Sequence, residues 1–280
     1  MVHYGLEHQI QRMEKIDTYP VYVEPFHVDF TGRLFLGVLG NHLLNAAGNH
    51  SQRRGWGIGA LNETRHTWVL SRLSIEMDEM PRGYEHLEVK TWVESVMKLF
   101  TNRNFAILRP DGTAYGYARS VWAMIDMETR RPCDLLTLYD GDILRYVVSD
   151  EENLCPIEGH GRFRFREPQL VRTIDTCYSD VDINGHINSI KYIEHILDLF
   201  PRNQLERGVR RFEIAYKTEA YLGDSLSFYT QKTEDGEETD VEVRKCVTAD
   251  SPGEVVCQAK VRFASTNDVE TTKQQNNEIS

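Results

Sequence analysis

The densest cluster of reactive side chains in this sequence lies within residues 178–188. Asp182, Asn184 and His186 are spaced two residues apart in it. A carboxylate and an imidazole in one loop can activate water, and an amide can orient a carbonyl group. Asp, Asn and Gly also form turns, and Asn188 can cap a helix, so the stretch alone is compatible with a structural loop. The histidine and the apolar helix that follows favour a chemical role.

A metal or cofactor site is not indicated. Asp182 and His186 are four residues apart, but no third ligand is spaced to complete a metal site. The five cysteines are odd in number and form no Cys-x-x-Cys pair, which predicts reduced thiols. The other nine of the ten histidines, including His42, His50 and His195, have no matching partner pattern and are predicted to be structural.

Two helices are predicted to position these groups. Residues 35–50 carry apolar side chains at helical spacing, and a second apolar helix follows the reactive loop and ends at Pro201. Alternation of apolar and polar residues predicts strands around both helices, including a hairpin whose turn is Pro110-Asp111-Gly112. The predicted strands are 73–77, 87–93, 117–126, 171–176, 212–216, 226–231, 240–248 and 255–263.

The sequence also contains a long internal repeat. Arg72-x-x-Ile75 recurs as Arg211-x-x-Ile214, 139 positions later, and Gly83 before Leu87 recurs as Gly223 before Leu226. This period is too long for a solenoid and indicates two fused copies of one domain. One long helix and about five antiparallel strands per copy predict an α+β fold. We expect an N-terminal domain at 1–140, a linker at 141–167, a C-terminal domain at 168–264 and a disordered tail at 265–280.

Composition excludes several classes of protein. The formal net charge of −11 disfavours nucleic acid and anionic membranes as partners. No window approaches 18 consecutive apolar residues, and the N-terminus lacks an apolar signal segment. We therefore expect a cytoplasmic protein without a membrane span, either a monomer or a homodimer.

The reactive loop resembles the active-site segment of acyl-ACP thioesterases, through Asp182-x-Asn184-x-His186-x-Asn188 and then Lys191-Tyr192-Ile193. Downstream, Tyr216-Lys217-Thr218-Glu219 with Gly223-Asp224-Ser225 resembles the second active-site segment of that family. The resemblance extends over about residues 21–263. Its further segments are Asn41-His42-Leu43, Trp68-Val69-Leu70-Ser71-Arg72, Thr91-Trp92-Val93 and Arg119-Ser120-Val121-Trp122.

The resemblance implies a double hot-dog fold, in which each antiparallel sheet wraps around its own long helix. It also implies hydrolysis of fatty acyl-ACP to free fatty acid and holo-ACP, with acyl carrier protein as the partner and no cofactor. The implied catalytic residues are Asp182, Asn184, His186 and Glu219. The first copy would line the acyl pocket, with Leu39, Leu43, Ala47 and Trp92 as possible contacts, although a packed core needs the same side chains.

Two features of the second segment bear on mechanism. The plant enzymes have a cysteine directly after the catalytic glutamate, where this chain has Ala220, so the resemblance leaves water activated by a carboxylate as the route. Strand alternation places Glu219 on the opposite face from Tyr216, which predicts a solvated charge. A catalytic role for Glu219 therefore requires a bulge or a surface formed between the domains.

Two other functions stay open at this point. The short Asp-x-Asn-x-His segment is shared with hot-dog thioesterases that act on acyl-CoA. A catalytically silent lipid-binding protein could use the same apolar pockets without turnover.

Overall fold

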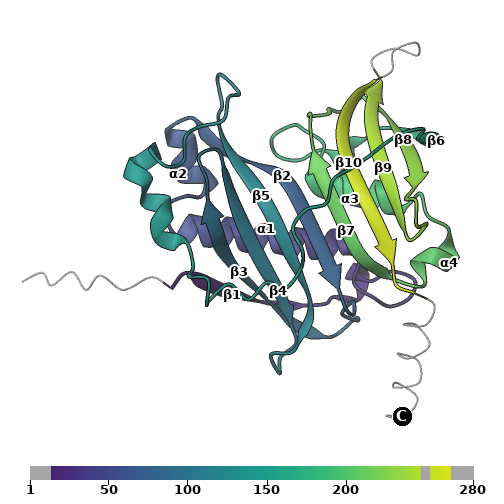
Figure 1. Cartoon of the computed structure of the whole chain (residues 1–280), viewed down its shortest axis with the longest axis horizontal. Helices are drawn as coiled ribbons and strands as arrows, with labels where there is room; N and C mark the ends of the chain where they lie inside the picture. The colour runs from purple at the N-terminus through teal and green to yellow at the C-terminus, as the bar shows by residue number, and fades with distance from the viewer. Residues whose placement is uncertain (1–13, 247–252, 266–280) are drawn as a thin grey trace, which may run out of the picture.

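The computed structural model describes residues 14–246 and 253–265. The N-terminal half contains the strands β1 (Ile16–Tyr22), β2 (His66–Met77), β3 (His86–Val96), β4 (Phe100–Leu108) and β5 (Ala114–Asp126). The C-terminal half contains β6 (Gln169–Asp175), β7 (Val209–Tyr216), β8 (Ser225–Lys232), β9 (Glu238–Cys246) and β10 (Glu254–Phe263). All of them join one ten-stranded antiparallel sheet in the order β1-β3-β4-β5-β2-β7-β10-β9-β8-β6 (Figure 1).

The sheet has the symmetry that the repeat predicted. From the outer edges inward, β1-β3-β4-β5-β2 has the same pattern as β6-β8-β9-β10-β7. The halves meet where β2 pairs with β7, with Leu73 opposite Ile214. The predicted strands are present, and the α+β class is confirmed; β1 is an additional strand that alternation did not reveal. Residues 247–248 of one predicted strand and 266–280 of the predicted tail lie outside the described residues.

Helices α1 (Leu36–Arg53) and α3 (Ser189–Leu197) pack against each other and share one core with strands of both halves (Figure 1). Glycines at the crossing allow this close approach. A Cβ atom on Gly40 would lie 2.7 Å from Cδ1 of Ile190, and one on Gly37 would lie 2.8 Å from Cγ of Glu194. The crossing places α3 beside the first turns of α1, with the beginning of α3 next to Gly40.

The second helix is shorter than its apolar pattern suggested. Helix α3 ends at Leu197, and Pro201 precedes the short helix α4 (Arg202–Leu205). A residue before proline is disfavoured in the helical conformation, so the chain leaves the helix early. Phe200 instead packs on Phe263, with ring centroids 5.0 Å apart. The other short helices are η1 (Pro25–His27), α2 (Ile58–Glu63), η2 (Leu138–Tyr146) and η3 (Tyr178–Asp180).

The segment between the halves crosses the face of the sheet opposite α1 (Figure 1). Residues on this segment cover Trp92, whose Nε1 donates a hydrogen bond to Oδ1 of Asn153. Further along, His160 bonds Ser74 of β2, and Gly161 N–H donates to Glu213 of β7. The linker therefore forms hydrogen bonds with a strand of each half, in addition to connecting the halves along the chain. No helix within the described ranges is both long and apolar enough to cross a membrane.

Candidate active site

The reactive loop is a tight turn built around the Asp182 carboxylate. Its Oδ1 accepts the backbone N–H groups of Asn184 (2.8 Å) and His186 (3.3 Å). The Asp182 N–H donates to the carbonyl of His186 (2.8 Å), which closes the turn. Gly185 occupies the left-handed region at φ +78°, a conformation that glycine adopts without a steric penalty. The geometry assigns the Asp182 carboxylate to holding the loop and the His186 backbone.

Both ends of this loop are anchored to Asp180, which is 2% exposed. Its carboxylate accepts hydrogen bonds from the Cys177 N–H (2.8 Å) and His195 Nε2 (2.9 Å), while its carbonyl accepts the Asn188 N–H (2.8 Å). Burial by itself raises the pKa of Asp180, but the hydrogen bonds from Cys177 and His195 outweigh it and lower that pKa. His195, predicted to be structural, thus supports the loop directly.

Glu219 reaches the loop because β7 ends before it. The strand stops at Tyr216, and the N–H groups of Lys217 and Thr218 both bond the carbonyl of Val256, so the regular alternation is broken there. Ala220 O then accepts the N–H of Ile187. Strand alternation therefore does not fix the direction of the Glu219 side chain, which is 35% exposed.

The Glu219 side chain lies at the centre of a polar cluster. His186 Nε2 is 3.5 Å from its Oε2, and the Tyr221 hydroxyl donates to the same oxygen at 3.3 Å. Arg130, from the loop after β5, forms an ion pair with Oε1. The Tyr221 ring packs edge-on against His186, with centroids 5.1 Å apart. One carboxylate therefore contacts an imidazole, a phenol and a guanidinium contributed by both halves of the chain.

The remaining predicted catalytic residue, Asn184, is exposed at the tip of the turn. Two N–H groups at the start of helix α3, which follows the loop, already have hydrogen-bond acceptors. Asn188 caps α3, with its side chain accepting the N–H of Ile190 (2.9 Å) and its carbonyl accepting that of Lys191 (2.9 Å). These two N–H groups are therefore not free to bind a developing oxyanion.

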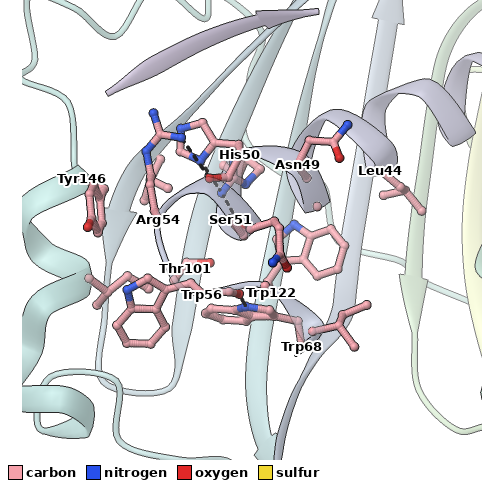
Figure 2. Close-up of a pocket in the computed structure, with 18 residues that line it drawn as sticks. Leu44, Asn49, His50, Ser51, Arg54, Trp56, Trp68, Thr101, Trp122 and Tyr146 are labelled. Atoms are coloured by element: carbon pink, nitrogen blue, oxygen red, sulfur yellow. Dashed lines mark hydrogen bonds between the residues drawn. The ribbon is translucent and has the colours of Figure 1, made fainter. Parts of the chain in front are cut away.

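A cavity of about 430 Å³ lies in the N-terminal half, between the second half of α1 and the sheet. Figure 2 shows Leu44 at one end of its lining and Arg54 with Tyr146 at the other. Leu44 lies one helical turn beyond Gly40, which contacts Ile190 near the start of α3. The Leu44 end is therefore the one directed toward the reactive loop, although none of the four predicted catalytic residues lines the cavity.

Of the predicted acyl contacts, only Ala47 lines this cavity. Leu39 and Leu43 are fully buried in the core that α1 shares with the sheet. Trp92 packs under the linker on the other face of the sheet. Trp56, Trp68 and Trp122 line the cavity instead (Figure 2).

Sequence patterns did not reveal Arg130 or Tyr221 as site residues. Arg130 is 89 positions from Glu219, and no spacing rule connects them. Tyr221 follows the Glu219 segment closely enough for proximity in sequence to have suggested it. Among the described residues, no group of three histidine, cysteine or acidic side chains is arranged to bind a metal ion. All five cysteines are free thiols.

Comparison with known proteins gives the same family for both halves. Residues 16–139 match the family model described as acyl-ACP thioesterase N-terminal domain, and residues 166–265 match the C-terminal domain of that family. An acyl-ACP thioesterase from Bacteroides thetaiotaomicron, whose crystal structure is known, is 54% identical in sequence to this chain. The two structures align with a TM-score of 0.81, and the alignment covers 89% of this chain and 98% of that chain.

More distant relatives are plant proteins. A chloroplastic palmitoyl-acyl carrier protein thioesterase of Arabidopsis thaliana is 28% identical over 239 residues, which cover 80% of this chain and 54% of the relative. The chain thus spans about half the length of this curated relative. The 12:0-ACP thioesterase from Umbellularia californica is 18% identical in sequence, and its structure aligns with a TM-score of 0.74 over 93% of this chain and 99% of that chain. This similarity is one of fold. The double hot-dog fold is confirmed.

Proposed function

This chain belongs to the acyl-ACP thioesterase family, and we propose that it hydrolyses the thioester of fatty acyl-ACP, releasing a free fatty acid and holo-ACP. The observation that carries this proposal is the placement of the Glu219 carboxylate 3.5 Å from Nε2 of His186. Such a pair can activate water next to a bound acyl group. Tethering of the acyl chain to the carrier would bring the thioester to the loop.

In the proposed reaction, Glu219 accepts a proton from water as the water oxygen attacks the thioester carbonyl. His186 orients that water and shares the proton, and the Asn184 amide donates a hydrogen bond to the carbonyl oxygen as it becomes an oxyanion. Collapse of the intermediate breaks the C–S bond. The thiolate departs without a strong general acid, because a thiol has a pKa of about 8.5, and it recovers the proton held by Glu219.

We assign supporting roles to the other polar groups of the cluster. Arg130 and Tyr221 hold the Glu219 carboxylate in one orientation, and Asp182 holds the turn that presents His186. Ala220 follows Glu219 and offers no thiol, so the proposed nucleophile is water.

The acyl chain is proposed to enter the cavity from the Leu44 end and to pass Ala47 and the tryptophans. This location replaces the contacts expected from Leu39, Leu43 and Trp92. The carrier protein would dock around the loop, where Ile183 is 99% exposed and Leu222 is also exposed. Exposed apolar side chains beside a catalytic group fit a protein partner. A cytoplasmic location belongs to this proposal.

The test compares dodecanoyl-ACP with dodecanoyl-CoA by steady-state release of free thiol. We expect a higher kcat/KM for the ACP substrate; a large preference for CoA would reassign the substrate. Fatty acid binding without any thiol release would establish a lipid-binding protein instead.

Catalytic variants separate the chemistry from binding. Glu219→Gln and His186→Ala should each lower kcat by about 10²–10⁴-fold, the contribution typical of a general base. Glu234→Gln is the matched control, because Glu234 is an exposed carboxylate paired with exposed Arg166. Full kcat in Glu219→Gln, measured with an unchanged melting temperature, would remove Glu219 from the mechanism.

A further inference from the structure

The cavity has two chemically different parts. Three tryptophans line it, and Arg54, Arg103 and His50 line it as well. Arg54 lies with Tyr146 at the end away from Leu44 (Figure 2), and Arg103 donates a hydrogen bond to His50, which lies one helical turn before Arg54. A pocket that holds only a hydrocarbon chain has no need of charged groups at its far end, since each one must be removed from water. The charges at this end therefore require a partner.

Arg103 has neutral partners only. It is 6% exposed, and its guanidinium donates to Oγ1 of Thr91 (3.2 Å), Nδ1 of His50 (3.3 Å) and Oγ of Ser51 (3.3 Å). No carboxylate in residues 14–246 or 253–265 lies within ion-pair distance, 4.0 Å, of this guanidinium. A buried cation of this kind is normally paired.

The acidic side chain nearby is already engaged. Asp17 accepts two hydrogen bonds from Arg54, at 2.8 and 3.0 Å, and one from the Tyr19 hydroxyl. The Nε atom of Arg54 is itself buried without a partner in the described structure. Arg54 and Arg103 thus bring two positive charges to this end of the cavity, against the one negative charge of Asp17.

His50 does not balance this excess of positive charge. Its Nε2 lies 3.0 Å from the carbonyl of Lys15 and must donate to it, so Nδ1 accepts from Arg103 and the ring is neutral. Burial, followed by the nearby Arg103, lowers the pKa of His50 to about 3. Burial, followed by Arg54, lowers the pKa of Arg103 to about 10. Both directions agree with uncompensated positive charge in a poorly solvated site.

We propose that the Arg103 end of this cavity is a carboxylate-binding site, which takes an aliphatic acid whose hydrocarbon chain lies along the tryptophans. A guanidinium binds a carboxylate through charge-assisted, often paired hydrogen bonds. Two sources supply this chemistry: a free fatty acid inserted with its carboxylate first, or a tethered acyl chain that ends in a second carboxyl group. The inference rests on the proposed function only for the second source.

Direct binding tests the site without any catalysis. Three of the four tryptophans line the cavity, so their fluorescence reports its occupancy. Titration of the full chain with dodecanoate and with dodecan-1-ol, both below their micelle concentrations, compares two chains that differ in the head group. We expect the acid to bind at least about tenfold more tightly, as expected for a hydrogen bond to a charged group. Equal affinity for the alcohol would overturn the proposal.

Variants identify the group responsible. Arg103→Met should abolish the preference for the acid while retaining affinity for the alcohol, and Arg166→Met, at an exposed ion pair, should change neither. Arg103→Lys keeps the charge but loses the planar fork, so it should retain a reduced preference and serves if the methionine variant fails to fold. A full preference for dodecanoate in either folded Arg103 variant would contradict the assignment.

Hydrolysis assays then distinguish the two sources. If the ligand is free acid, dodecanoate should inhibit hydrolysis of dodecanoyl-ACP competitively, and Arg103→Met should relieve the inhibition. If it is a tethered chain, an acyl-ACP ending in a carboxyl group should be hydrolysed faster than its methyl-ended counterpart, and Arg103→Met should remove that advantage. Absence of both effects would overturn the link to thioester chemistry. If the protein binds dodecanoate but hydrolyses no thioester, the proposed function is wrong and the proposed carboxylate site still stands.

Discussion

At the scale of single residues, the candidate site is organised by what surrounds Glu219. Its carboxylate contacts the His186 imidazole and the Tyr221 hydroxyl from its own half of the chain, and it forms an ion pair with Arg130 from the other half. Arg130 is held in the left-handed region, at φ 58°, in the loop that follows β5. The cation that orients the proposed base is therefore delivered by the N-terminal half.

Removal of this cation should slow the proposed chemical step. Arg130 holds the Glu219 carboxylate in the proposed mechanism, and a misplaced general base loses part of its effect. Arg130→Met should therefore lower kcat by about tenfold or more with little change in KM, and Arg130→Lys should restore part of kcat. Arg65→Met is the matched control, because Arg65 forms an exposed ion pair with Glu128. An unchanged kcat in folded Arg130→Met would contradict a positioning role for Arg130.

At the scale of elements, the reactive loop depends on a buried carboxylate behind it. Asp180 contacts Cys177 at the start of the loop, His195 on α3, and Asn188 at the end of the loop. A loop with both ends fixed to one residue keeps His186 facing Glu219 at little entropic cost on substrate binding. The helix that follows contributes both the cap and the supporting histidine.

Asp180→Asn should therefore lower stability in a manner that depends on pH. The pKa of Asp180 is lowered by folding, so its ionised form stabilises the fold above the unfolded pKa of about 3.9, and this contribution disappears as pH falls through the folded pKa. We expect a loss of about 1–3 kcal/mol at pH ~7, shrinking below pH ~4. Urea denaturation at several pH values measures it, with exposed Asp150→Asn as control. A difference that stays constant down to acid pH would exclude ionised Asp180 as the cause.

At the scale of the molecule, the seam between β2 and β7 joins the halves. Arg211 is buried there and bonds Glu76 on β2 and Glu213 on β7, both through charged hydrogen bonds. Its guanidinium also reaches the linker carbonyl of Gly159 at 3.2 Å. One side chain thus links both halves and the segment between them.

Arg211→Met should destabilise the whole chain. Loss of one partner leaves Glu213 buried with a negative charge that lacks its cation, and breaking such a pair typically costs about 3–5 kcal/mol. Arg166→Met removes an exposed pair and should cost at most about 1 kcal/mol. Urea denaturation midpoints compare the two variants. Equal midpoints would show that strand pairing and the core hold the seam without this arginine.

The amino-acid sequence by itself determined the features that depend on neighbours along the chain. Helical spacing around Leu39 and Leu43 predicted α1, and alternation predicted most of the strands. The repeat predicted two copies of one unit, which agrees with the symmetric order of the strands in the sheet. The spacing of Asp182, Asn184 and His186 located the reactive loop. These patterns are visible because helix and strand periodicity act over a few residues.

Only the tertiary structure decided which distant side chains meet. Glu219 leaves the alternation of β7 because its strand ends at Tyr216, and Arg130 reaches it from 89 positions away. Trp92 was expected at the acyl chain but lies under the linker, while Arg103 enters the cavity. Contacts of this kind depend on how two halves and a linker pack together, and no local period in the sequence encodes that packing.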